Sequence, residues 1–207
     1  MGAGIAYEFK LRHPQMFTAY EAFCKSGQIK IGTLWIYSPQ EQPSCCSKVL
    51  NFPTKNHWKD PSTVEFLELG LQKFLDTYKQ KGITSIAFPL LGASLGGLSE
   101  SEVLKTMEFY LKQTDINIEI WHFDSNAKDD LFDDFKNKFT SLNNESIKKH
   151  SGLRSTAIEK IKSALNQSDI NSISSLLSVK GIGKVSLEKA FDFTRIQHHS
   201  PETGTLI

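Results

Sequence analysis

Hydrophobic positions along the first part of the chain alternate between helical and strand-like spacing. Apolar side chains three and four positions apart are typical of amphipathic helices, whereas short apolar runs bounded by proline, glycine or polar turns are typical of strands. Helical spacing covers residues 7–24, with a break near Pro14, and residues 61–81 and 100–113. Strand-like runs cover residues 32–37, 48–52, 83–89 and 116–123, the third of which predicts a buried strand. This alternation predicts an α/β fold with a mixed, at least partly parallel sheet flanked by helices.

The remaining residues predict a small all-α region. Residues 129–142 place Leu131, Phe132, Phe135 and Phe139 on one face of a helix, which a linker follows. The stretch SLLSVKGIGKVSLEKAFDF predicts two short helices joined by a glycine turn. We therefore expect four segments along the chain. They are an α/β domain at 1–125, a helix and linker at 126–150, a helical module at 151–197 and a disordered tail at 198–207.

Charge and cysteine content narrow the class of protein. A net charge of +1 gives no support to a strongly basic nucleic-acid protein, and only residues 150–207 lean basic, with seven Lys/Arg against five Asp/Glu. Cys24, Cys45 and Cys46 are odd in number, and the adjacent pair suits neither a mutual disulfide nor a metal site. We expect a cytoplasmic protein with no bound metal, and no apolar run is long enough for a membrane span.

Two glycine-rich loops and one lysine are the candidates for chemistry. Residues 2–4 open the chain, and residues 92–97 follow a strand and precede a helix, where backbone N–H groups can hold a phosphate. Neither loop has the spacing of a Rossmann or P-loop motif, and an ordinary strand-to-helix turn is the alternative. Lys55, just beyond a strand, has three possible roles: phosphate contact, nucleophile or solvated side chain.

Four stretches, MGAGIAYEFK, VLNFPTKNHWKDPS, KGITSIAFPLLGASLGGLS and NIEIWHF, resemble in order and spacing a macro domain of the terminal ADP-ribose glycohydrolase type. The likeness is greatest to the DNA ADP-ribosyl glycohydrolase (DarG-like) antitoxins, which remove ADP-ribose that a toxin has placed on DNA bases. The resemblance covers residues 1–123. It implies an ADP-ribose site and a hydrolase that needs no cofactor.

The resemblance assigns roles to individual residues. Lys55 corresponds to the lysine that acts at the distal ribose, either by attacking the anomeric carbon or by activating it. Thr54 precedes it. Two loops would contact the distal ribose and the diphosphate of ADP-ribose. The first consists of Gly2, Ala3, Gly4, Ile5 and Ala6, and the second of Gly92, Ala93, Ser94, Leu95, Gly96, Gly97 and Leu98.

Two departures from the family pattern affect these expectations. Gly97 stands where the protein-directed members carry an aspartate, which favours a DNA or nucleotide adduct as the substrate. The family also has about two strands before its first loop, with an acid that contacts adenine and an asparagine near the distal ribose. The sequence begins beyond them, so we expect a chain that is truncated at its N-terminus and weak or inactive in that form.

The segment Lys180, Gly181, Ile182, Gly183 and Lys184 resembles the turn of a helix-hairpin-helix motif, in which backbone N–H groups and a basic residue hold a DNA phosphate without sequence preference. HSGLRSTAIEKIKSAL upstream resembles a degenerate partner copy. A purely structural helix pair is the alternative.

Together, the macro-domain-like region and the helix-hairpin-helix-like region favour hydrolysis of ADP-ribose from DNA. The expected partners are ADP-ribosylated DNA and an ADP-ribosylating toxin. The alternatives are a non-catalytic ADP-ribose reader or truncated remnant, and a hydrolase of small ADP-ribose derivatives.

Overall fold

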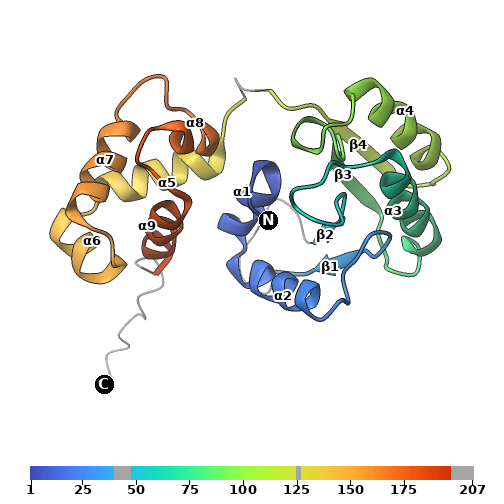
Figure 1. The fold of residues 1–207 in the computed structure, drawn as a ribbon, viewed down its shortest axis with the longest axis horizontal. Coiled ribbons are helices and arrows are strands. Elements are labelled where there is room, and N and C mark those ends of the chain that lie inside the picture. The colour runs from blue at the N-terminus through green and yellow to red at the C-terminus, as the bar shows by residue number, and fades with distance from the viewer. Residues whose placement is uncertain (40–47, 125–126, 197–207) are drawn as a thin grey trace, which may run out of the picture. The chain divides into compact units, whose positions relative to one another are not determined.

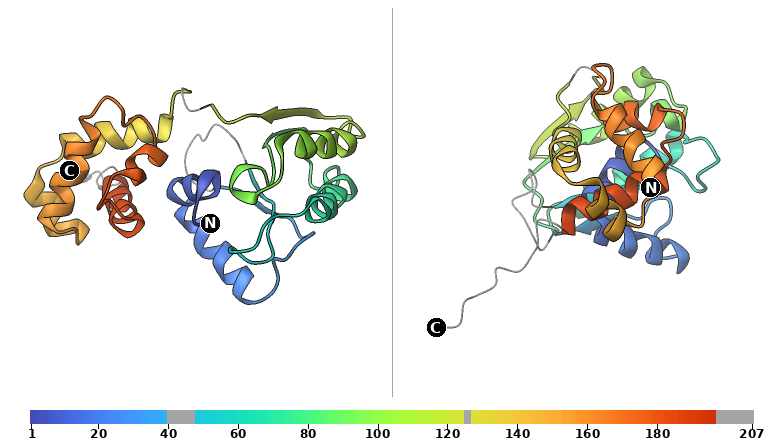
Figure 2. Two further views of the ribbon diagram at one scale, coloured as in Figure 1. Left: turned by 45° about the horizontal axis from the view of Figure 1, so that its top comes forward. Right: turned by 90° about the vertical axis from the view of Figure 1, so that its left-hand side faces the viewer.

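The computed structural model describes residues 1–39, 48–124 and 127–196. These residues form two units, which Figures 1 and 2 show as ribbons. The α/β unit consists of Met1 and the described residues within His13–Ser125, and the helical unit consists of Gly2–Arg12 and the described residues within Asn126–Ile207. Cys45, Cys46 and the expected tail at 198–207 lie outside the described residues.

The α/β unit confirms the order of helices and strands expected from the hydrophobic pattern. Helix α2 starts at Pro14, where the break was expected, and α3 is capped by the Thr63 side chain, which accepts a hydrogen bond from the Phe66 N–H at 3.3 Å. The elements are α2 (Pro14–Lys25), β1 (Trp35–Tyr37), β2 (Val49–Asn51), α3 (Val64–Thr77), β3 (Ser85–Pro89), the 3-10 helix η1 (Ser94–Gly96), α4 (Glu100–Leu111) and β4 (Asn117–Trp121).

The four strands of the described residues pair as two small sheets. Strands β3 and β4 are parallel, in the register Ser85 to Asn117, as the alternation of strands and helices predicted. Strands β1 and β2 are antiparallel, with Trp35 opposite Asn51. A two-stranded sheet is marginally stable by itself, so each sheet depends on the helices packed against it.

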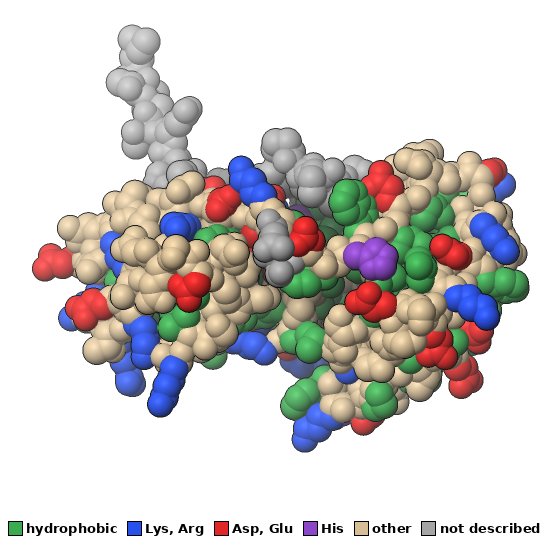
Figure 3. Space-filling model, turned by 90° about the horizontal axis from the view of Figure 1, so that it is seen from above, with side chains coloured by type: hydrophobic (Ala, Val, Ile, Leu, Met, Phe, Trp, Pro, Cys, Tyr) green, Lys and Arg blue, Asp and Glu red, His purple; other side chains and the backbone are tan. Residues whose placement is uncertain are grey.

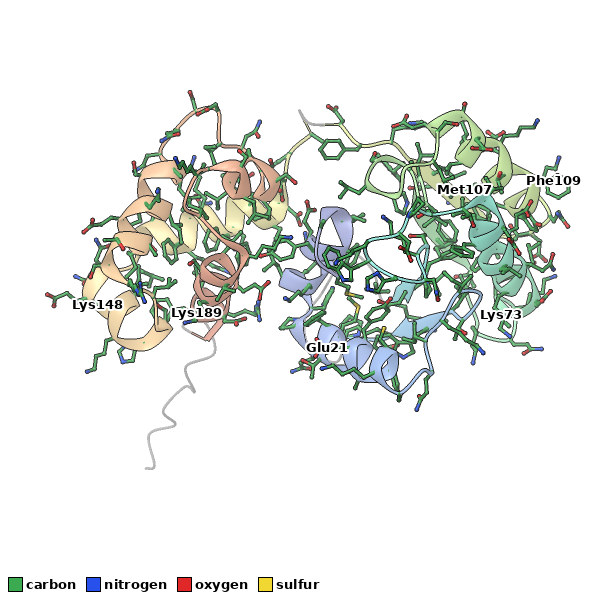
Figure 4. All side chains as sticks on the ribbon, in the orientation of Figure 1. Glu21, Lys73, Met107, Phe109, Lys148 and Lys189 are labelled. Carbon is green, nitrogen blue, oxygen red and sulfur yellow. The ribbon has the colours of Figure 1, made fainter. Side chains whose placement is uncertain are left out.

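Helices α3 and α4 pack together and supply the core of the α/β unit (Figure 2). Phe74 of α3 meets Phe88 of β3 edge-on, with their ring centroids 5.5 Å apart. In α4, Met107 is fully buried whereas Phe109 points outward (Figure 4). The expectation that β3 is a buried strand was wrong, because only Phe88 among its residues is buried. The helices cover one face of the β3–β4 pair, and alternate residues of β3 point away from them.

The helical unit contains six helices among the described residues. Its core is apolar and includes Phe135 and Phe191, whose rings stack with centroids 4.1 Å apart. Its elements are α1 (Gly4–Arg12), α5 (Asp130–Ser141), α6 (Asn144–Ser151), α7 (Ser155–Leu165), α8 (Ile173–Ser178) and α9 (Lys184–Ile196). Helix α5 buries Phe132, Phe135 and Phe139, as expected. Helix α6 occupies the segment expected to be a linker.

Helices α6–α7 and α8–α9 form an internal repeat. The α8–α9 hairpin begins 29 residues after the α6–α7 hairpin. The N-caps of their first helices are Asn143 and Ser172, and their turns begin at Gly152 and Gly181, both with positive φ. The residue after each glycine is buried. A lysine of each hairpin also lies against the glycine turn of the other. Lys189 of α9 donates to the Gly152 carbonyl at 3.2 Å. Correspondingly, a Cβ added at Gly181 would meet Lys160 of α7.

Helix α1 packs with the helical unit, although its residues were assigned to the α/β domain on sequence. Tyr7 and Leu11 are buried in the helical core. Lys10 Nζ forms an ion pair with Glu188 at 2.7 Å, and the Arg12 guanidinium contacts both carboxylate oxygens of Asp130 at 2.8 and 3.1 Å. These contacts join the first twelve residues to α5 and α9.

Candidate functional site

Lys55 and the second glycine-rich loop lie together in the α/β unit. Lys55 follows β2, whose end is fixed by buried Asn51; the Asn51 amide donates to the Trp35 carbonyl at 3.3 Å. Lys55 Nζ donates a hydrogen bond to the carbonyl oxygen of Leu95 at 2.8 Å. Two of the segments expected to act on one ligand are therefore in direct contact, although 40 residues separate Lys55 from Leu95 in sequence.

The second loop has a constrained backbone. Gly92 and Gly97 adopt φ of +75° and +87°, in the left-handed region that glycine occupies without strain. Ser94 is the only described non-glycine residue with positive φ, at +49°. Such a conformation costs free energy and is found most often at binding and catalytic sites. Within the loop, the Leu98 N–H donates to the Gly92 carbonyl at 3.2 Å and closes the turn.

Ser62 packs beneath this loop and forms its floor, a role that no sequence pattern indicated. Its N–H donates to the Gly96 carbonyl at 2.8 Å. A Cβ added at Gly96 would lie 2.8 Å from Ser62 Oγ, and one added at Gly92 would lie 3.2 Å from Ser62 Cβ. Close packing beneath the loop therefore leaves little room for a side chain at Gly92 or Gly96. This reason differs from the one that the sequence suggested, which was that glycines at these positions let an anion approach the backbone.

The hydroxyl of Ser62 is itself buried, and no hydrogen-bond partner for it occurs in the described part of the chain. A buried hydroxyl without a partner costs about 1–3 kcal/mol. The loop that it supports is therefore held at the expense of stability.

The first candidate loop lies in the other unit. Gly4, Ile5 and Ala6 form the first turn of α1, and the Gly2 carbonyl accepts a hydrogen bond from Lys184 Nζ. The structure thus brings Thr54, Lys55 and Gly92–Leu98 together in the α/β unit and places Gly2–Ala6 among the residues of the helical unit.

The candidate DNA-binding residues form the turn between α8 and α9. Gly181 has a φ of +90°, Ile182 is buried, and the Ile182 N–H donates to the Val179 carbonyl at 3.0 Å. Lys180 is exposed. Lys184 is engaged by Gly2, as described above, and its Nζ lies 5.7 Å from the centroid of the Tyr7 ring.

A search of the described ranges finds no group of three His, Cys, Asp or Glu side chains placed to hold a metal ion. Likewise, no described helix is both long enough and apolar enough to span a membrane. A shallow hollow does occur, but it lies along α7 beside Val179 and contains none of the residues expected to bind ADP-ribose.

Residues 1–107, slightly more than half of the chain, match the macro domain family. The chain belongs to the macro domain family. Within that family, it is 40% identical over 103 residues to the DNA ADP-ribosyl glycohydrolase of Mycobacterium tuberculosis (strain ATCC 25618 / H37Rv); the match covers 50% of this chain and 29% of the relative. It is 33% identical over 135 residues to the DNA ADP-ribosyl transferase-DNA ADP-ribosyl glycohydrolase fusion protein of Thermosipho africanus (strain H17ap60334), covering 58% and 35%.

Solved structures agree with the sequence comparison. The macrodomain of Mycobacterium tuberculosis DarG superposes with a TM-score of 0.56 at 36% identity, over 60% of this chain and 82% of that one. Thermosipho africanus DarTG in complex with ADP-ribose superposes with a TM-score of 0.56 at 31% identity, over 63% and 36%. The expected fold class is therefore confirmed. The match spans about a third of the length of the curated relatives.

Proposed function

We propose that this chain is a DNA ADP-ribosyl glycohydrolase, which releases ADP-ribose from modified DNA. The observation that carries the proposal is the contact between Lys55 and the second loop, at 2.8 Å from Nζ to the Leu95 carbonyl. The chain has this lysine and this loop in the part that resembles proteins named for the activity. Gly97 in that loop supports a DNA adduct over a protein adduct, as the sequence comparison with the family suggested.

In the proposed site, backbone N–H groups of Gly92–Leu98 hold the diphosphate. Lys55 acts at the anomeric carbon of the distal ribose. The bond from that carbon to the DNA base breaks, the base takes a proton, and the oxygen of water forms the new bond to the carbon, so that ADP-ribose and unmodified DNA result. Lys55 stabilises this exchange as a cation or takes part as a nucleophile.

The helical unit is proposed to hold the DNA. Support comes from the α8–α9 turn, where Gly181, Ile182 and Gly183 lie between the basic residues Lys180 and Lys184, an order typical of a turn that holds a DNA phosphate. The internal repeat also supports it, because the α6–α7 turn has Arg154 where the second turn has Gly183. Figure 3 shows several Lys and Arg side chains standing out from this unit. Contacts of this kind are electrostatic and independent of sequence.

The proposed partners are ADP-ribosylated DNA and a toxin that modifies it, and the proposed location is the cytoplasm. A relative whose name joins a DNA ADP-ribosyl transferase to a DNA ADP-ribosyl glycohydrolase supports the pairing of the two activities.

The test is the identity of the products formed from a single-stranded oligonucleotide that carries one ADP-ribose. The proposal requires free ADP-ribose and the unmodified oligonucleotide, measured by mass spectrometry. Titration with free ADP-ribose separates the alternatives: binding without product formation would identify a reader. Turnover of ADP-ribose 1″-phosphate but not of the oligonucleotide would identify a hydrolase of small derivatives.

A further inference from the structure

Trp58 is 75% exposed on a turn three residues beyond Lys55. The turn is ordered by its own hydrogen bonds, because the Asp60 N–H donates to the His57 carbonyl at 3.0 Å and the Lys59 N–H contacts His57 Nδ1 at 3.4 Å. Three residues of chain span at most about 11 Å. A ligand group next to the ribose on which Lys55 acts is therefore within reach of the indole ring.

The surroundings of Trp58 are cationic and aromatic. Lys59 Nζ lies 5.2 Å from the centroid of the Trp58 ring, and the His57 ring lies 5.9 Å away, tilted by 40°. Lys55 and Lys59 place positive charge on both sides of the indole along the chain. An exposed aromatic face between lysines is the combination with which proteins bind single-stranded nucleic acid, since bases stack on the ring and phosphates are attracted to the cations.

A protein partner would need a larger apolar surface than this turn provides. Asn56, Lys59 and Asp60 are polar and exposed around the single tryptophan. Leu95, whose carbonyl accepts from Lys55, is an exposed apolar side chain of the site. The charge favours an anionic chain carrying flat rings.

We propose that Trp58 is a stacking surface for an unpaired base of the DNA substrate, so that the site favours ADP-ribosylated single strands over duplexes. This inference rests on the proposed function. It makes Trp58 a determinant of substrate class and leaves the binding of ADP-ribose itself to the loops.

The test compares kcat/KM on three substrates: the ADP-ribosylated single-stranded oligonucleotide, the same oligonucleotide in a duplex, and the ADP-ribosylated nucleoside. Trp58→Ala should lower kcat/KM on the single strand by roughly 10-fold or more and leave the nucleoside almost unaffected, whereas Trp58→Phe should retain most of the activity. Phe109→Ala is the matched control. Phe109 is likewise an exposed aromatic residue, 58% exposed, with Lys112 Nζ 5.6 Å from its ring centroid, and it lies on α4 outside the Lys55 turn.

An equal loss on all three substrates, or no loss with Trp58→Ala, would overturn the inference. A second readout does not depend on hydrolysis. An unmodified single strand should quench tryptophan fluorescence in the wild-type chain, and Trp58→Phe should remove that quenching, although Trp35 and Trp121 remain. Quenching without turnover would mean that the glycohydrolase proposal fails while the stacking surface stands. Turnover without quenching, and with no effect of Trp58→Ala, would mean that the stacking surface is wrong while the glycohydrolase proposal stands.

Discussion

The packing of Gly96 on Ser62 gives a quantitative prediction about the candidate loop. A methyl group added at Gly96 would lie 2.8 Å from Ser62 Oγ and 3.3 Å from Ser62 Cβ. Gly96 does not have a positive φ, so Gly96→Ala introduces a steric clash without backbone strain. Overpacking of this kind costs about 1–3 kcal/mol of unfolding free energy.

The opposite sign is expected at Ser62. Its hydroxyl is buried, and in the described structure it has no partner, so Ser62→Ala removes a desolvation cost of about 1–3 kcal/mol and leaves stability unchanged or raised. In the double variant the closest contact, to Oγ, is gone, and only the contact to Cβ at 3.3 Å remains. We therefore expect Ser62→Ala to rescue Gly96→Ala by more than its own effect, with a coupling of about 1 kcal/mol or more.

Tryptophan emission during urea unfolding measures this effect. The chain has three tryptophans, at positions 35, 58 and 121, all within the α/β unit, so their emission reports the unfolding of that unit. With a urea dependence of about 1–3 kcal/mol per molar, Gly96→Ala should lower the midpoint by about 0.5–2 M.

Gly97→Ala is the control. A Cβ at Gly97 would meet nothing within 4 Å, but its φ of +87° makes alanine strained there. Ser62→Ala should not relieve that strain, and the two effects should add. If Ser62→Ala rescues both glycine variants equally, or if Gly96→Ala costs nothing, the account of the loop floor is refuted.

Two further predictions concern the helical unit. Burial, with a smaller contribution from the charge of Glu188, raises the pKa of Tyr7 above its ordinary value near 10. Below pH 10 the stability linked to Tyr7 is fully present. It is lost as pH rises further, because the unfolded chain releases the tyrosine proton before the folded chain does. Circular dichroism should therefore show less loss of helix above pH 10 in Tyr7→Phe than in the wild-type chain. Lys180→Ala should weaken binding of the full chain to DNA of any sequence and reduce the slope of log K against log salt by about 0.9. Lys73→Ala, an equal change of charge on α3 (Figure 4), should leave the slope unchanged. Equal slopes for Lys180→Ala and the wild-type chain would exclude the α8–α9 turn as a phosphate contact.

Local patterns were sufficient to predict most elements of the fold. Pro14 marked the break between α1 and α2, and apolar spacing identified α3, α4 and α5. Helix α6 was missed because only Ile147 among its residues is buried, so it has almost no apolar periodicity. Its caps, Asn143 and Gly152, were the local signals that indicate a helix there.

Contacts between distant segments were beyond the reach of the sequence. Ser62 lies next to Gly96 only after the chain has passed through α3 and β3, and no local pattern marks a serine as a floor. Tyr7 and Leu11 form an apolar face that fits either unit, and the ion pair between Lys10 and Glu188 links residues 178 positions apart. The sequence therefore located the second candidate loop correctly as a turn, but Gly4, Ile5 and Ala6 of the first are helical, and the helical core against which α1 packs was not revealed.

In the proposed reaction Lys55 drives release of ADP-ribose from DNA, and single-turnover kinetics on the singly modified single strand measure its contribution. The wild-type chain should release ADP-ribose, and Lys55→Ala should reduce the rate constant by roughly 100-fold or more while binding of free ADP-ribose changes little. Lys55→Arg separates the two roles, since a retained cation restores a charge effect but not a nucleophile. Release by Lys55→Ala at the wild-type rate would contradict the account, as would a wild-type chain that binds ADP-ribose and releases none from DNA.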